Sequence, residues 1–258
     1  MSPAVSAQAP EPVQAGAESF ASDGSPVGVL VCHGFTGSPR TVRPWAEQLA
    51  AAGLTVRAPR LPGHGTQWQD LAKTGWRDWY GAVESAFAEL RGECERVFVT
   101  GLSLGACLAL RLAAERGGDV SGVVVANPSL APDTRLFWLA PVLKYVVPSL
   151  PGIAGDIKKK DADEGGYKRI PVRAAATLPE LWRTTAALLP DVKQPLLIFR
   201  STVDHVVGPA SMKVLTTALP TAEVRPLTDS FHVATLDNDA PLIFDGTLEF
   251  INEHGYKD

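Results

Sequence analysis

The sequence has 258 residues, of which 45% are hydrophobic and 20% charged, and its formal net charge at pH 7 is -4. This size and composition predict one globular domain with a modest insertion, and the absence of any lysine- and arginine-rich stretch argues against a nucleic-acid partner. No run of about eighteen or more apolar residues occurs, which excludes a membrane-spanning helix.

The N-terminal 24 residues predict a disordered tail, which leaves 25–258 as the folded domain. They are rich in Ala, Pro, Ser and Glu, and their apolar residues do not recur at a helical or strand spacing. They also lack the basic start and the continuous apolar run of a secretory signal. Three cysteines, Cys32, Cys94 and Cys107, cannot all pair, so we expect free, buried thiols. Together these features predict an intracellular, cytoplasmic protein; the alternative is an exported protein whose signal has been removed.

Strands and helices alternate along the folded part of the chain. Short apolar runs predict strands at Val27–Cys32, Leu54–Ala58, Arg96–Thr100, Val123–Ala126, Leu196–Arg200 and, more weakly, Ala222–Pro226. Helical spacing and strong helix formers predict helices from Pro39 to Gly53 and at Trp76–Leu90, Ala106–Arg116, Leu178–Leu189, Pro209–Leu219 and Pro241–Glu253. The alternation predicts a mostly parallel sheet with helices on both faces, whose ligands bind beyond the carboxyl ends of the strands.

One stretch, at about 128–190, interrupts this alternation. It carries prolines, aromatics and the charged run DIKKKDADEGGYKR, but no clear buried strand. We therefore predict a cap insertion over the sheet. Its apolar residues between Leu136 and Leu150 form either the core of the cap or the wall of an acyl channel.

The sequence Gly101-Leu102-Ser103-Leu104-Gly105 has the G-x-S-x-G pattern and lies directly between a predicted strand and a predicted helix. In that context the serine occupies a tight turn at the helix N-terminus, and the flanking glycines let strand and helix approach each other. We predict Ser103 as a nucleophile. The alternative is a serine that only caps the helix.

A nucleophilic serine needs a base within hydrogen-bond reach and a third group that fixes the tautomer of the base. Asp204 and His232 each follow a predicted strand, in the order Ser, Asp, His that this pattern requires. The competing histidines precede the serine, share the loop of the acid or lie in the terminal tail: His33, His64, His205 and His254. The competing acids do not follow a convincing buried strand: Asp191, Asp229 and Asp237.

Two backbone amides must stabilise the oxyanion that forms on attack. We predict that one donor is the backbone amide of Leu104, the residue after the nucleophile, and that the other is the amide of Phe35 in the loop HGFTG. The Phe35 ring can also pack against the substrate channel. His64 in PGHG has no second ligand at metal spacing, so we predict that it supports its loop and that no metal is bound. No phosphate loop or dinucleotide fingerprint occurs in the right context, and no cofactor is predicted.

With these motifs the chain resembles bacterial monoacylglycerol lipases and the related small thermostable carboxylesterases of the α/β-hydrolase superfamily. The resemblance is carried by HGFTGSP, PRLPGHGT, GLSLG, DHVV and SFHVATLD, and is patchy only in the cap. It implies an α/β-hydrolase fold with a cap, the triad Ser103, Asp204 and His232, and the amide donors Phe35 and Leu104. It also implies that Glu164 in the cap binds glycerol hydroxyls; the alternative is a solvated carboxylate in a charge run.

The expected function is therefore hydrolysis of carboxylic esters, specifically of monoacylglycerols, through an acyl-enzyme. The open alternatives are a broad short- and medium-chain carboxylesterase, a thioesterase, and a non-catalytic relative that binds a small ligand. The expected partner is a small lipid or ester substrate, with no stable membrane insertion and at most transient contact with a lipid surface.

Overall fold

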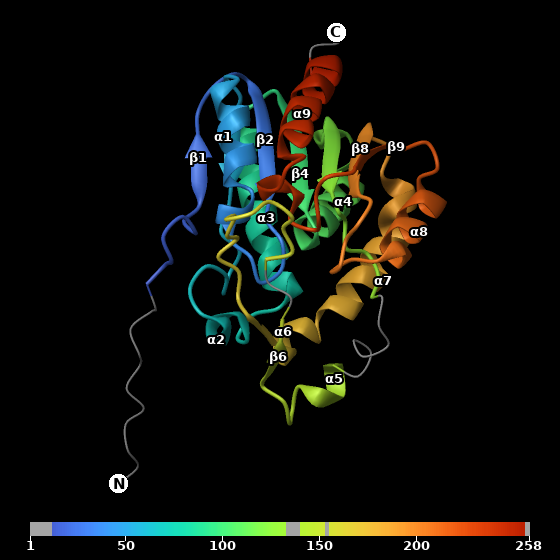
Figure 1. The fold of residues 1–258 in the computed structure, drawn as a ribbon. Helices are drawn as coiled ribbons and strands as arrows, with labels where there is room; N and C mark the ends of the chain where they lie inside the picture. Colours follow the sequence, from blue (N-terminus) through green and yellow to red (C-terminus); the bar gives the residue numbers. More distant parts are fainter. Residues whose placement is uncertain (1–11, 133–139, 153–154, 256–258) are drawn as a thin grey trace.

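A seven-stranded sheet forms the centre of the protein, as shown by a computed structural model that describes residues 12–132, 140–152 and 155–255 (Figure 1). The strand order is β1-β3-β2-β4-β5-β8-β9, and every neighbouring pair is parallel except β1 with β3. The strands are β1 Phe20–Ser22, β2 Val27–Cys32, β3 Thr55–Ala58, β4 Arg96–Leu102, β5 Gly122–Ala126, β8 Leu196–Ser201 and β9 Glu223–Leu227. The predicted mostly parallel sheet is confirmed, with strand ends within two residues of those expected.

Helices cover both faces of the sheet, which explains the unbroken apolar runs of its central strands. Alternate residues of β2 point to opposite faces: Val29 and Val31 join one apolar cluster, and Leu30 and Cys32 join the other. The first cluster contains side chains of α1 Arg43–Ala51 and α9 Ala240–Gly255. The second contains side chains of α3 Trp76–Glu93, α4 Leu104–Arg116 and α8 Pro209–Ala218.

The cap lies between β5 and β8, beyond one end of the sheet (Figure 1). Its described elements are α5 Ala140–Leu143, β6 Ser149–Pro151, β7 Arg169–Pro171, α6 Val172–Ala175 and α7 Leu178–Leu188. Strands β6 and β7 form a small antiparallel sheet that we did not predict, because each has three residues and ends in proline. Leu181 and Trp182 of α7 join the apolar cluster around α4, which anchors the returning helix to the main domain.

The remaining elements are single turns in the connecting loops. They are η1 Pro39–Thr41, α2 Trp68–Leu71, η2 Gly117–Asp119, η4 Leu189–Asp191 and η5 Ala234–Leu236. Among the described residues, no helix is both long enough and apolar enough to cross a membrane.

The predicted disordered tail, residues 1–24, is wrong in its second half. Strand β1 pairs with β3, the Gln14 amide donates to the carbonyl of Gly65 at 2.8 Å, and Ala17 is buried. Backbone pairing at a sheet edge depends little on side chains, so the composition of this segment did not reveal it. The prediction for residues 1–11 lies outside the described part of the chain.

Candidate active site

Ser103 occupies a strained turn between β4 and α4. Its backbone has φ 57° and ψ -114°, a conformation that residues other than glycine rarely adopt. A Cβ atom at Gly105 would lie 2.1 Å from the carbonyl oxygen of Cys32, and one at Gly101 would lie 2.4 Å from the carbonyl carbon of Gly105. Both glycines are therefore needed for the strand and the helix to approach this closely. The turn places Ser103 at the N-terminus of α4.

Asp204 and His232 meet in the loops that follow β8 and β9. His232 Nδ1 lies 3.0 Å from Asp204 Oδ2, and both side chains are buried. Because the ionised carboxylate only accepts, Nδ1 carries the proton and Nε2 is left as an acceptor. Ser103 lines the same cavity as His232, although no hydrogen bond joins Ser103 Oγ to the imidazole among the described residues. Such bonds are often long in free enzymes and shorten when substrate binds.

The carboxylate of Asp204 is held on both oxygens. Oδ1 accepts the amides of Val206 at 2.9 Å and Val207 at 2.8 Å, while Arg200 Nη1 donates to Oδ2 at 2.7 Å. Burial disfavours the charged form, but the hydrogen bond and charge of His232, the Val207 amide and the Arg200 guanidinium outweigh it, so the pKa of Asp204 is lowered. Sequence reasoning missed Arg200, although it ends the predicted strand four residues before Asp204.

The two predicted oxyanion donors line the same cavity. Neither the Phe35 amide nor the Leu104 amide donates a hydrogen bond to another described residue, so both N–H groups remain available to a ligand. The Phe35 ring packs tilted against Trp79 at 5.5 Å between centroids and edge-on to His64 at 6.2 Å.

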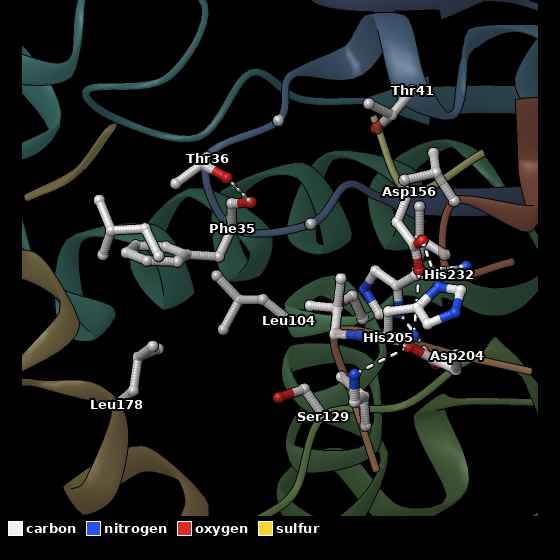
Figure 2. A pocket seen from close by; sticks show the side chains of 18 of the residues that line it. Phe35, Thr36, Thr41, Leu104, Ser129, Asp156, Leu178, Asp204, His205 and His232 are labelled. Carbon is white, nitrogen blue, oxygen red and sulfur yellow. Dashed lines mark hydrogen bonds and ion pairs between the residues drawn. The ribbon is translucent and has the colours of Figure 1, made fainter. Parts of the chain in front are cut away.

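The cavity has a volume of about 380 Å³ and mainly apolar walls. Figure 2 shows Phe35 and Leu178 across the pocket from His232 and Asp204. The apolar lining includes Leu102, Ala131, Ile170, Leu178, Trp182 and Val207. We offered two alternatives for the apolar residues of Leu136–Leu150, the core of the cap or the wall of an acyl channel. Neither fits Val142, Tyr145 and Val146, which are exposed to solvent and do not line the cavity; residues 136–139 lie outside the described chain.

Glu164 also lines this cavity and is only 8% exposed. Its Oε1 accepts the Gly155 amide at 2.9 Å, and the absence of a side chain at Gly166 makes room for the carboxylate. Burial raises the pKa of Glu164, an effect that the Gly155 bond and the nearby His232 only partly offset. The alternative of a solvated carboxylate in a charge run is therefore wrong.

The residues that competed with the triad have other places. His64 is fully buried, with Nδ1 3.1 Å from the Pro62 carbonyl oxygen, and His205 Nδ1 lies 2.7 Å from Asp156 Oδ1. Asp237 accepts hydrogen bonds from backbone amides instead of contacting the His232 side chain.

In the part of the chain that the structure describes, no group of three or more His, Cys, Asp or Glu is placed to hold a metal ion. All three cysteines are buried and unpaired, as predicted.

Residues 26–238 match the family model described as serine aminopeptidase, S33. The chain belongs to this family. A relative named thermostable monoacylglycerol lipase, from Bacillus sp. (strain H-257), is 40% identical over 94% of this chain and 97% of its own. The carboxylesterase of Bacillus subtilis (strain 168) is 25% identical over 91% of this chain and 96% of its own.

Two solved structures share the architecture of this chain. One, described with the metagenome-derived lipolytic enzymes LipS and LipT, has a TM-score of 0.91 at 39% identity and covers 94% of this chain and 100% of that chain. The monoacylglycerol lipase of Paleococcus ferrophilus has a TM-score of 0.75 at 21% identity, covers 92% of this chain and 98% of that chain, and supports the fold alone. The predicted α/β-hydrolase fold and the predicted resemblance are both confirmed.

Proposed function

We propose that this protein hydrolyses carboxylic esters, and specifically monoacylglycerols, with Ser103 as nucleophile. One observation carries the proposal: a single, mainly apolar cavity holds Ser103, the imidazole of His232 and the buried carboxylate of Glu164. Apolar walls suit an acyl chain, and a few polar groups suit the alcohol end of the substrate. The relative at 40% identity, named a thermostable monoacylglycerol lipase, adds support.

In the proposed reaction, Ser103 Oγ attacks the ester carbonyl carbon while His232 Nε2 takes the hydroxyl proton. Asp204 holds the imidazole in the required tautomer and stabilises the imidazolium that forms. The amides of Leu104 and Phe35 donate to the oxyanion, a contribution of about 3–4 kcal/mol for a single donor in comparable enzymes.

Collapse of the tetrahedral intermediate releases the alcohol, which takes its proton from His232, and leaves an acyl group on Ser103. Water then attacks the acyl carbon while His232 takes a proton from it. The bond between the acyl carbon and Ser103 Oγ breaks, Oγ takes the proton back from His232, and the fatty acid leaves. The carboxylate of Glu164, which keeps acceptor positions beyond its bond to Gly155, binds the free hydroxyls of glycerol in this proposal.

The test compares a monoacylglycerol with the ethyl ester of the same fatty acid. We expect a higher kcat/KM for the monoacylglycerol, and Glu164→Ala should remove most of that difference while leaving ethyl-ester hydrolysis in place. Ser103→Ala should lower kcat for both esters by about a million-fold. Equal rates on the two wild-type substrates would exclude the glycerol preference, and activity in Ser103→Ala would exclude the nucleophile.

A broad carboxylesterase is the second candidate, because the 25% identical relative bears that name. It would hydrolyse short- and medium-chain esters of many alcohols with similar kcat/KM. An acyl thioester in the same panel detects a thioesterase. Failure of a fluorophosphonate probe to label Ser103 would favour a non-catalytic ligand-binding protein.

The family description names an aminopeptidase, so an aminoacyl anilide belongs in the panel. We expect ester hydrolysis to exceed anilide hydrolysis, because the cavity wall is mainly apolar and the relatives at 39% and 40% identity are described as lipolytic. A higher kcat/KM on the anilide would reverse this assignment.

A further inference from the structure

Asp156, a residue of the cap, contacts the loops of both Asp204 and His232. Its Oδ2 accepts the backbone amides of His205 and His232, each at 3.1 Å, and its Oδ1 lies 2.7 Å from His205 Nδ1. The Asp156 side chain is only 8% exposed. Figure 2 shows it beside His205 and His232 at the polar end of the pocket. One carboxylate therefore joins two loops that follow different strands.

The cap segment that carries Asp156 is itself fixed to the histidine loop. The Val233 amide donates to the backbone carbonyl of Asp156 at 3.1 Å. In the opposite direction, Asp237 accepts the amides of Lys158 at 2.7 Å, Lys159 at 2.8 Å and Phe231 at 2.8 Å. Residues 156–159 and the histidine loop thus hold each other through bonds in both directions.

These contacts bear directly on the geometry of the triad. His205 immediately follows Asp204, so a hydrogen bond to the His205 amide also restrains the position of Asp204. The His232 amide belongs to the proposed base itself. Because both amides donate to the same oxygen atom, the two loops cannot move far apart. The 3.0 Å contact between His232 Nδ1 and Asp204 Oδ2 is thereby maintained. We propose that Asp156 is a positioning residue, which keeps the base and its orienting acid in register for the reaction.

This inference rests on the proposed ester hydrolysis, and its test separates bonded geometry from charge. Asp156→Asn removes the charge but keeps an oxygen for the two amides, and its NH2 group can donate to His205 Nδ1. Asp156→Glu keeps the charge but moves the oxygens by one methylene. Asp156→Ala removes both. Asp161→Asn is the matched control: it removes the same charge from an exposed cap residue at φ 64°, a conformation that Asn tolerates.

We expect kcat to fall by about 10- to 100-fold in Asp156→Ala, because displacement of a reacting group by about 1 Å costs this much. KM for the same ester should change by less than about threefold. Asp156→Glu should lose kcat as well, while Asp156→Asn should keep at least about ten times the kcat of the alanine variant. The Asp161→Asn control should match the wild type. Thermal unfolding of each variant shows that the compared enzymes are folded.

Two results would overturn the inference. One is an alanine variant whose kcat equals that of the control. The other is a glutamate variant as active as wild type beside an impaired asparagine variant, which would show that charge matters and position does not. If the alanine variant does not fold, the glutamate and asparagine variants still decide between these outcomes. A wild-type protein without esterase activity would instead contradict the proposed function.

Discussion

Arg200 and His232 bind the same oxygen atom of Asp204. Arg200 Nη1 lies 2.7 Å from Asp204 Oδ2, and His232 Nδ1 lies 3.0 Å from it. The guanidinium also donates to the Val207 carbonyl, which helps to hold the loop of the acid. Arg200 therefore both places the carboxylate and neutralises part of the charge that faces the imidazole.

Replacing Arg200 with methionine should move the acid limb of the kcat/KM profile to higher pH. A cation near the imidazole disfavours its protonated form, so removing that cation favours protonation and the base is lost at a higher pH. Arg225→Met, on the neighbouring strand and paired with Glu223 and Glu249, is the charge-matched control and should leave the limb in place. An unchanged or lowered limb in Arg200→Met would contradict this electrostatic role.

The side chain of His33 orients the peptide group of Phe35, the proposed oxyanion donor. The Leu61 amide donates to His33 Nε2 at 3.1 Å, so Nδ1 carries the proton and donates to the Gly34 carbonyl at 2.9 Å. That carbonyl belongs to the same planar peptide as the Phe35 N–H, which points the opposite way. Burial lowers the pKa of His33 to about 4, which keeps the ring neutral and in this tautomer at pH 7.

His33→Phe should therefore lower kcat and kcat/KM together, by about 10- to 100-fold, because the lost interaction acts in the transition state. His64→Phe is the comparison, since His64 is equally buried but is not bonded to the Gly34–Phe35 peptide. We expect a smaller kinetic effect there. Steady-state kinetics on one ester, with thermal unfolding as a fold check, decides the point. A rise in KM at constant kcat would indicate a substrate-packing role instead.

The positions of the three proposed triad residues could be predicted because each of them follows a strand in the local sequence. Ser103, Asp204 and His232 all stand at carboxyl ends of parallel strands, which the topology brings to one edge. Asp156 was not predictable: it stands in a charged run that looks solvated, and its partner His232 is 76 residues away. Strand β1 escaped prediction for a related reason, since three residues at a sheet edge carry no usable periodicity.

Glu164→Gln should stabilise the protein at neutral pH. Burial raises the pKa of Glu164 in the folded state, so ionisation costs stability, and this cost develops as pH rises from the unfolded pKa through the folded one. Glutamine keeps an acceptor for Gly155 without the charge. We expect a higher Tm for the glutamine variant than for the wild type at pH 7. The gain should vanish near pH 4, where the glutamate is protonated; a gain that stays constant with pH would contradict the argument.

The turn at Ser103 predicts an asymmetry between two glycine substitutions. A Cβ at Gly105 would lie 2.1 Å from the Cys32 carbonyl oxygen and 2.7 Å from that of His33, both backbone atoms that cannot rotate away. Gly105→Ala should therefore destabilise the protein by more than about 3 kcal/mol. Gly81, inside α3, has nothing within 4 Å of its added Cβ, so Gly81→Ala should stabilise by about 0.5–1 kcal/mol.

Urea denaturation midpoints measure both effects on proteins that differ from wild type by one methyl group. The Gly105 change also pushes on the end of β2, which leads into the loop of Phe35, so any folded fraction of Gly105→Ala should lose kcat as well as stability. Gly81→Ala should keep its kcat, because α3 contributes no residue to the lining of the cavity. Equal midpoints for the two variants would mean that strand and helix can separate at the serine turn, and the close approach would then not be what requires glycine there.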